Sequence, residues 1–378
     1  MVDDAMVDED AAADRARAED RVVRAFVPGR LCLLGEHSDW AAERASADGP
    51  GACLVVGTRE GIEGEAFVPA GARRGRFTVR SAEDGETYSR AASDELELER
   101  DAREGGRWSY VAGTLLECVR AIPEMREGGL EATLTSKGLP VKRGLSSSAA
   151  ACVLVARLAN LSYARGWTVE REMEVGYLGE SRWTPSKCGR MDQACAYGPE
   201  RCTLMTFDAE KKVTATRVTS GGDVHVLVVD LEGTKDTIRI LADLSRAFDA
   251  GDVKLRAALG SENRRHVDEA LRAIQLGDAK KLGAACAAAQ ATFMNAAKHL
   301  CPSELSAPIM HDAIRSVEKT LPHLIYGAKG VGSQGDGAVQ FVCRGANEAR
   351  ELRAHFETLG KKSFIITLSP DAREAMHA

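Results

Sequence analysis

Hydrophobic and polar positions follow both strand and helix periods along this chain. Leu130, Ala132 and Leu134 alternate with Glu131 and Thr133, as in a half-buried strand. Comparable apolar runs predict strands at residues 22–27, 31–34, 53–56, 77–80, 130–135, 224–230, 338–343 and 363–368. Helices are predicted at residues 110–122, 148–164, 168–180 and 347–359, and within 238–300, where Ala, Leu, Arg and Glu are frequent. This mixture predicts an α+β protein with two lobes.

The length of the chain sets the expected number of domains. With 378 residues, of which 44% are hydrophobic, the chain can bury the cores of about two domains. We place the first domain at residues 21–215 and the second at residues 216–378. Residues 1–20 are rich in Asp, Glu and Ala, and we expect them to form a disordered acidic tail.

The run from Pro140 to Ala150 joins the predicted strand at 130–135 to an apolar helix through a loop of glycine and serine. The free N–H groups and the dipole at the start of a helix favour an anion, and small residues let a phosphate approach the backbone. The run therefore predicts a phosphate-binding loop, with a plain helix N-cap as the alternative. The chain contains no Walker-type P-loop, and the G-x-G-x-x-G match at Gly330 precedes a strand-like run instead of opening a helix.

A second group of polar residues surrounds the apolar run at 31–34. Arg30 precedes this run, and Glu36, His37 and Asp39 follow it around a glycine turn. Side chains of these types can donate hydrogen bonds to sugar hydroxyls or accept them. A metal site is one alternative, disfavoured by the single His and the lack of a Cys partner in the run. A solvated turn after a strand is the other.

A third segment carries two carboxylates. Met173, Tyr177 and Glu180 fall on one side of the helix predicted at 168–180, which is its apolar face. An inward-facing carboxylate needs a cation or a metal as its partner. Asp192 follows a break in the chain and begins a stretch of small residues. A Glu at a helix end and an Asp at an N-cap are the ordinary interpretation of these two positions.

Together these segments resemble the GHMP kinases, a superfamily that includes galactokinase, homoserine kinase, mevalonate kinase and phosphomevalonate kinase. Residues 30–40 are similar to the galactokinase pattern G-R-x-x-L-I-G-E-H-T-D-Y, residues 140–150 to P-x-x-x-G-L-S-S-S-A-A, and residues 189–196 to G-x-M-D-Q. Residues 108–113 look like its W-x-x-Y-V-x-G, and residues 327–337 would be the glycine-rich loop near the C-terminus. The resemblance implies a ribosomal-S5-like N-terminal domain and a ferredoxin-like C-terminal domain.

The resemblance also implies a kinase that uses ATP and Mg²⁺ to phosphorylate a hydroxyl of a small sugar, with the anomeric hydroxyl favoured. Asp192 would act as general base or orient the hydroxyl, and Arg30 would stabilise charge on the transferred phosphoryl group. Ser148 and Glu180 would hold the magnesium ion. The sugar would be bound by Glu36, His37 and Asp39. The nucleotide-binding residues would be Gly144, Leu145, Ser146, Ser147, Ser148 and Ala149.

Some positions depart from galactokinase and leave the substrate open. The connection at 40–51 is longer than usual, and Trp40 stands where galactokinases have Tyr. Residues 332–337 replace a G-G-G-F-G-G-type loop and introduce Asp336. Residues 228–237 resemble the V-D-T-G-x-K-x-x-T run of mevalonate-type members. The alternatives are therefore a kinase for arabinose, fucose, glucuronic acid or a mevalonate-type alcohol, and a galactokinase-like sensor that binds sugar and ATP without turnover.

The net charge and the cysteines limit the expected binding partners and cellular compartment. The net charge of −6 disfavours binding to nucleic acid or to an anionic membrane. The ten cysteines form no C-x-x-C pair, and no secretory segment is recognised, so we expect reduced thiols in the cytoplasm. No apolar stretch approaches the ~18 residues that a membrane span requires. The expected partner is a small sugar, and the sequence does not fix the oligomeric state.

Overall fold

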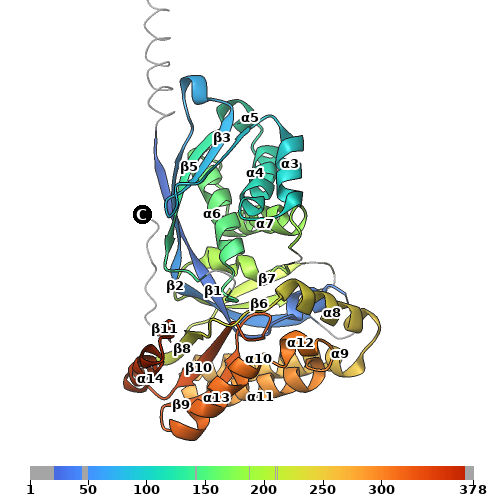
Figure 1. Ribbon diagram of the computed structural model, residues 1–378, viewed down its shortest axis with the longest axis vertical. Coiled ribbons are helices and arrows are strands. Elements are labelled where there is room, and N and C mark those ends of the chain that lie inside the picture. The colour runs from blue at the N-terminus through green and yellow to red at the C-terminus, as the bar shows by residue number, and fades with distance from the viewer. Residues whose placement is uncertain are drawn as a thin grey trace, which may run out of the picture. The chain divides into compact units, whose positions relative to one another are not determined.

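The computed structural model describes residues 21–44, 50–140, 143–186, 188–208, 210 and 212–370. The predicted α+β class is confirmed, and Figure 1 shows the order of the elements. The acidic tail predicted at residues 1–20 lies outside the described residues, as do residues 45–49 of the long connection.

The described chain forms two compact units, each built from separate stretches of sequence. Unit 1 contains residues 21–28, 60–139 and 148–186, and unit 2 contains most of the remainder, including residues 188–370. Two long strands, β1 (Val23–Leu34) and β2 (Gly51–Phe67), contribute residues to both units. The two units are defined only by how compactly their residues pack. They do not test the domain boundary expected between residues 215 and 216, which stays a prediction.

Strand β1 joins two runs that were predicted as separate strands, 22–27 and 31–34. Pro28 and Gly29 lie inside the strand as the structure has it. The fixed φ of proline is compatible with an extended backbone, so a proline does not by itself end a strand where its missing N–H is not needed.

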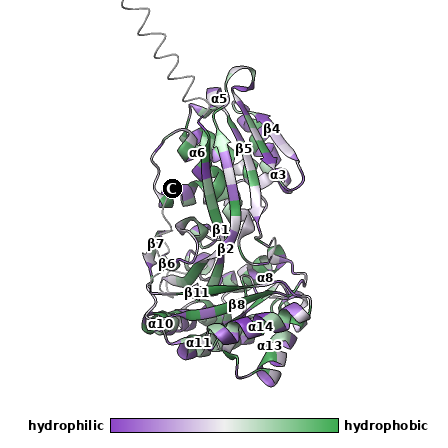
Figure 2. Ribbon diagram, turned by 90° about the vertical axis from the view of Figure 1, so that its left-hand side faces the viewer, coloured by the Kyte–Doolittle hydropathy of each residue, from purple (hydrophilic) through white to green (hydrophobic). Residues whose placement is uncertain are grey.

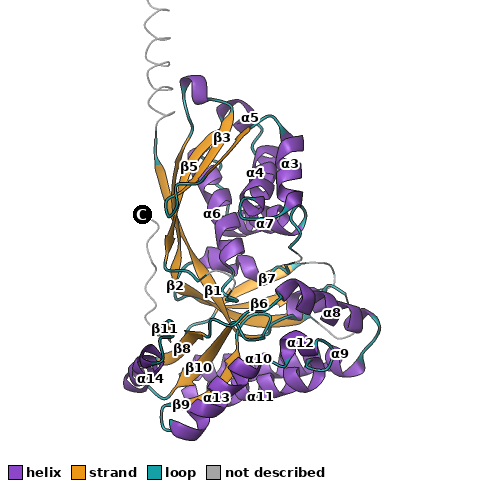
Figure 3. Ribbon diagram, viewed as in Figure 1, coloured by secondary structure: helices purple, strands orange, loops and turns teal. Residues whose placement is uncertain are grey.

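Unit 1 consists of a sheet with helices on one face, as Figure 3 shows. Its strands run in the order β4-β3-β5-β2, in which β3 and β5 are parallel whereas the pairs β3–β4 and β2–β5 are antiparallel. The elements of unit 1 are β3 (Arg76–Ser81), β4 (Thr87–Ala91), α3 (Glu95–Glu104), α4 (Ser109–Ala121), α5 (Met125–Gly128), β5 (Leu130–Lys137), α6 (Ser147–Ser162) and α7 (Val169–Ser181), with a short 3₁₀ turn, η2 (Gly71–Arg73).

Helix α7 is held at a fixed distance from helix α4 in unit 1. It begins where the Thr168 side chain accepts a hydrogen bond from the N–H of Arg171, as a good N-cap does. A Cβ on Gly179 would lie 2.6 Å from the Cα of Thr114, so glycine is needed for this approach of the two helices. The close packing fixes the adjoining residue, Glu180.

Unit 2 contains an antiparallel sheet in the order β11-β8-β10-β9. Strands β8 (Val224–Asp230), β10 (Ala338–Cys343) and β11 (Ser363–Leu368) have the bounds that were predicted for them. Figure 2 shows the hydrophobic character of β8, whose Leu227 and Val229 pack in one buried core with Phe341 and Phe356. The remaining elements beside this sheet are β9 (Ile325–Gly330), α13 (Pro308–Thr320) and α14 (Ala346–Thr358).

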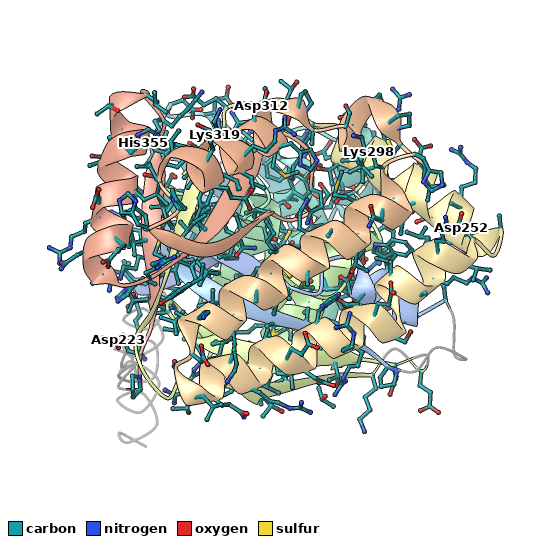
Figure 4. The ribbon with its side chains drawn as sticks, turned by 90° about the horizontal axis from the view of Figure 1, so that it is seen from below. Asp223, Asp252, Lys298, Asp312, Lys319 and His355 are labelled. Atoms are coloured by element: carbon teal, nitrogen blue, oxygen red, sulfur yellow. The ribbon has the colours of Figure 1, made fainter. Side chains whose placement is uncertain are left out.

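The rest of unit 2 combines a short stretch of sheet with a group of helices. The first residues of β2 pair with β6, which pairs with β7. A second core gathers Trp40, Phe248 and Phe293. Figure 4 labels Lys298, directly after α11, and Asp312 and Lys319 of α13, all three of which are exposed. The elements are α2 (Ser38–Ala42), η3 (Asp192–Tyr197), β6 (Cys202–Phe207), β7 (Val213–Arg217), α8 (Thr237–Asp249), α9 (Val253–Leu259), α10 (Ser261–Leu276), α11 (Ala279–Ala297) and α12 (Pro302–Leu305).

The length and apolar character of the helices bear on whether any of them could span a membrane. Within the described part of the chain, none of them is both long enough and apolar enough to cross a bilayer.

Candidate functional site

Arg30 links the end of β1 to the glycine–serine loop and to Asp192, all within unit 2. Its side chain is almost fully buried, and one guanidinium nitrogen, Nη1, donates to the carbonyl of Gly144 at 3.1 Å. The other, Nη2, forms an ion pair with the carboxylate of Asp192. The backbone N–H of Arg30 donates to the carbonyl of Leu145 at 3.1 Å. Burial lowers the pKa of Arg30, but the charge and hydrogen bond of Asp192 together with the nearby Cys32 and Cys53 outweigh burial, so the pKa is raised and Arg30 is a permanent cation.

Glu36 is held by a partner that the sequence did not reveal. Lys329, which is 1% exposed, pairs through Nζ with the Glu36 carboxylate and donates to the carbonyl of Gly330 at 2.9 Å. Glu36 is itself 8% exposed. The pair therefore lies in the interior of unit 2, where each charge depends on the other.

His37 is fixed in one orientation and one tautomer. The indole N–H of Trp40 donates to Nδ1 of His37 at 3.1 Å, and the ring of Phe293 stacks on the imidazole with centroids 5.4 Å apart. Burial lowers the pKa of His37 to about 4, so the ring is neutral at physiological pH. Because an indole N–H can only donate, Nδ1 is the acceptor and the ring proton resides on Nε2. His37 is therefore a neutral Nε2–H donor.

Asp39 is buried against the segment that precedes Asp192. Its Oδ2 accepts a hydrogen bond from the N–H of Met191 at 3.2 Å. A Cβ on Gly189 would lie 1.9 Å from this oxygen, so the glycine is required for the approach. Burial, and next the negative charge of Asp192, raise the pKa of Asp39 to about 6.

The glycine–serine loop has the features of an oxyanion site. Gly144 and Ser146 both have positive φ values, 80° and 56°. The hydroxyl of Ser146 is buried and has no hydrogen-bond partner among the residues that the structure describes. Leu145 and Ala149 are buried and anchor the loop and the first turn of α6. Because buried polar atoms in native proteins are normally satisfied, the Ser146 hydroxyl is expected to meet a ligand atom.

In unit 1, Ser148 and Glu180 lie side by side. The hydroxyl of Ser148 donates to Oε1 of Glu180 at 2.8 Å, and the hydroxyl of Ser186 lies 3.4 Å from the same oxygen. Glu180 is 1% exposed. Within the described chain, no group of three or more His, Cys, Asp or Glu side chains could hold a metal by itself. A hydroxyl and one carboxylate fit Mg²⁺, which usually keeps waters and takes phosphate oxygens as further ligands.

The residues predicted for the site thus fall into two groups. Unit 2 brings together Arg30, Glu36, His37, Asp39, Asp192 and residues 144–147. Unit 1 contains Ser148, Ala149 and Glu180. The sequence analysis missed Lys329 and Phe293, which contact Glu36 and His37. A lysine inside an otherwise uncharged strand, Ile325–Gly330, was the available signal for the first.

Asp336, in the divergent loop near the C-terminus, has a structural partner. Its Oδ1 accepts a hydrogen bond from the N–H of Met310 at 2.9 Å, in the first turn of α13. A carboxylate at a helix N-terminus is favourable because it satisfies a free N–H and opposes the helix dipole. Asp336 therefore caps α13.

Comparison with known proteins shows what the chain is similar to. Residues 109–199 match the model of the GHMP kinases N terminal domain. Galactokinase of Actinobacillus pleuropneumoniae serotype 3 (strain JL03) is 24% identical over 53% of this chain, and the match spans 48% of that protein, about half its length. The structure of Lactococcus lactis galactokinase complexed with galactose superposes with a TM-score of 0.69 at 17% identity, covering 96% of this chain and 98% of that one. Mevalonate kinase of Methanococcus jannaschii gives 0.68 at 14% identity, covering 92% and 98%.

These findings show that residues 109–199 are similar to the N-terminal domain of GHMP kinases and that the chain has the α+β fold seen in galactokinase and mevalonate kinase. The chain is galactokinase-like, as its motifs predicted.

Proposed function

We propose that this protein is an ATP-dependent small-molecule kinase that transfers the γ-phosphate to a sugar hydroxyl, with the anomeric hydroxyl as the acceptor. The observation that carries the proposal is the buried Arg30, which joins the carboxylate of Asp192 to the carbonyl of Gly144 in the glycine–serine loop. A carboxylate that can receive a hydroxyl hydrogen is thereby connected to a loop suited to phosphate. The match of residues 109–199 to the N-terminal domain of GHMP kinases supports the same reaction class.

In this proposal the two groups of site residues have separate tasks. Asp192 accepts the hydrogen bond of the attacking hydroxyl and orients it, and Arg30 offsets negative charge on the phosphoryl oxygens. Mg²⁺ bound with ATP would neutralise phosphate charge, and Ser148 and Glu180 would hold it. Gly144 to Ala149 would bind the phosphates through backbone N–H groups and the Ser146 hydroxyl.

The sugar would be bound by one donor and two acceptors. His37 offers its Nε2–H, while Glu36 and Asp39 offer carboxylate oxygens. Galactose is the first candidate because it is the ligand of the Lactococcus lactis galactokinase structure. Arabinose, fucose, glucuronic acid and mevalonate remain alternatives, since Trp40 and the loop at 332–337 depart from the galactokinase pattern.

The acceptor affinity is expected to depend on pH through Asp39. Its pKa of about 6 is raised, so the carboxylate gains a proton as the pH falls through 6; it then loses its charge, and one oxygen becomes an O–H donor and a weaker acceptor. We expect kcat/KM for the sugar to fall by up to ~10-fold per pH unit below 6, whereas Asp39→Asn should be low and flat over that range. Rate profiles between pH 5 and 8 at saturating MgATP test this. An unchanged profile in Asp39→Asn would assign the inflection to another group.

Removal of the Glu180 carboxylate is expected to raise the requirement for magnesium. Glu180→Gln keeps the size of the side chain but loses the charge that holds the ion, so the Mg²⁺ concentration at half-maximal rate should rise at least ~10-fold. EDTA should abolish turnover in the wild type. The matched control is Glu174→Gln, a partly exposed position on the same helix. Equal Mg²⁺ titrations for Glu180→Gln and the wild type would contradict the role of Glu180.

The function itself is tested by ADP release from MgATP in the presence of single sugars. We would use galactose, arabinose, fucose, glucuronic acid, galacturonic acid, N-acetylgalactosamine and mevalonate. Release that depends on one of the sugars supports the proposal and identifies the acceptor. ATP binding without release for any of them would favour the sensor.

A further inference from the structure

Lys235 lies in the segment that follows β8 and precedes α8, in the run that departs from galactokinase. Its side chain is partly exposed, and Nζ donates to the carbonyl of Val331 at 3.1 Å. The same carbonyl lies against Gly144, since a Cβ on that glycine would be 3.0 Å from it. Lys235 is thus next to the glycine–serine loop within unit 2.

The divergent C-terminal loop is shaped around this lysine. A Cβ on Gly335 would be 3.3 Å from the Cβ of Lys235, and one on Gly337 would be 3.0 Å from its Cε and 3.3 Å from its Nζ. Asp336, between the two glycines, points to the N-terminus of α13 and does not pair with Lys235. The loop therefore supports the lysine stem and leaves its ammonium without a carboxylate.

Three other cations near Lys235 in the described chain are neutralised. Arg30 pairs with Asp192, Lys329 with Glu36, and Arg143 with Asp230, the last at 2.8 Å. In the part of the chain that the structure describes, Lys235 forms no ion pair. Burial, and next the charge of Arg30, lower the pKa of Lys235 to about 8. A partly buried positive charge that the protein does not balance is costly unless a ligand balances it.

We propose that Lys235 binds an oxyanion of the ligand in this site, a phosphate or carboxylate group that balances the charge of its ammonium. The inference rests on the proposed kinase function and extends it. Two sources carry this chemistry: the phosphoryl group that is transferred, and an acidic group on the acceptor. The proposed role of Lys235 also explains two departures from the galactokinase pattern together. The run at 228–237 supplies the lysine, and the loop at 332–337 makes room for it.

The variants that test this are Lys235→Met, which removes the charge at similar length, and Lys235→Arg, which keeps it. Lys361→Met is the matched control, since Lys361 is a lysine of unit 2 that pairs with Glu232 at 2.9 Å. Sulfate is the first probe, measured by titration calorimetry on the full chain. We expect its affinity to fall ~10- to 100-fold in Lys235→Met, as for loss of one charged hydrogen bond, and to change less than ~3-fold in the other two variants.

Two further measurements distinguish the sources. If Lys235 binds the transferred group, Lys235→Met weakens binding of the Mg²⁺ complex of AMPPNP and leaves MgADP unaffected. If it binds the acceptor, both nucleotides bind as before, and the ratio of kcat/KM for galacturonic acid to that for galactose falls at least ~10-fold. The proposal is overturned if sulfate, AMPPNP and the acceptor ratio all stay within ~2-fold of the wild type. If Lys235→Met loses sulfate binding and the wild type phosphorylates no sugar, the proposed function is refuted and the inference about Lys235 stands.

A pH titration gives an independent readout. Lys235 binds an anion only when protonated, so sulfate affinity should fall as the pH rises through about 8. The charged groups that face the lysine are Arg30, Glu36, Arg143 and Lys329, with His37, Asp236 and Glu304 nearby. Lys235→Met should lose the pH dependence, and Lys235→Arg should shift it to higher pH. The same pH dependence in Lys235→Met and the wild type would overturn the assignment to Lys235.

Discussion

Replacing Asp192 with asparagine is expected to lower kcat at least ~100-fold. The carboxylate is paired with Arg30 and is about a quarter exposed, with a side-chain accessibility of 23%, so it is both oriented and reachable by a ligand. Asparagine has nearly the same shape but offers one neutral oxygen, which holds the attacking hydroxyl and the Arg30 guanidinium less strongly. Binding of MgATP should change little, because the effect arises in the transfer step.

The control for this variant is Asp223→Asn, an exposed carboxylate just before β8 that Figure 4 labels on the outer side of unit 2. It should keep kcat within ~2-fold and the stability within ~0.5 kcal/mol. Steady-state kinetics with the sugar that supports ADP release give both values. If Asp192→Asn turns over at the wild-type rate, the role proposed for Asp192 is wrong.

Replacing Lys329 with methionine is expected to destabilise unit 2 strongly. Lys329 is 1% exposed and Glu36 is 8% exposed, and among the described residues neither side chain forms a second ion pair. Removal of one member of a buried ion pair leaves an uncompensated charge and typically costs about 3–5 kcal/mol. The midpoint of unfolding in guanidinium chloride should fall accordingly, with the slope unchanged.

A second variant separates the lost charge from the lost volume. Glu36 loses its hydration on burial, and in Lys329→Met nothing compensates its charge. Removing this charge by adding Glu36→Gln should therefore recover at least about half of the stability lost in Lys329→Met alone. Lys361→Met, which loses a partly exposed lysine, should change stability by no more than ~0.5 kcal/mol. An equal loss in the single and double variants would mean that packing, and not the charge on Glu36, explains the effect.

The fold could be predicted from the sequence where one element buries a continuous apolar run. Strands β8, β10 and β11 are such runs and have their predicted bounds. Strand β7 was not predicted, since its residues are mostly exposed and its pairing with β6 is what makes it a strand. Strand β9 contains a lysine and two glycines, and its last N–H is satisfied by the Gln290 side chain of α11, a contact that local sequence does not reveal.

The site could be predicted only in part, for a related reason. Short motifs located Arg30, Asp192 and the loop at 144–149, because each motif is local in sequence. The partner of Glu36 is 293 residues away, and the ring that stacks on His37 comes from α11. The raised pKa of Asp39 follows from burial beside Asp192, and the lone charge of Lys235 follows from how its neighbours pair. These properties depend on tertiary packing, which a single sequence does not specify.

The central claim is that the chain moves a phosphoryl group from ATP to a sugar, and ³¹P NMR tests it most directly. The protein would be incubated with MgATP and galactose, or with whichever sugar gives the highest ADP release. The account predicts a new phosphomonoester resonance, coupled to the anomeric proton, that grows as the γ-phosphate signal of ATP declines and is absent with Asp192→Asn. An unchanged ATP spectrum with every sugar, or growth of inorganic phosphate alone, would contradict it.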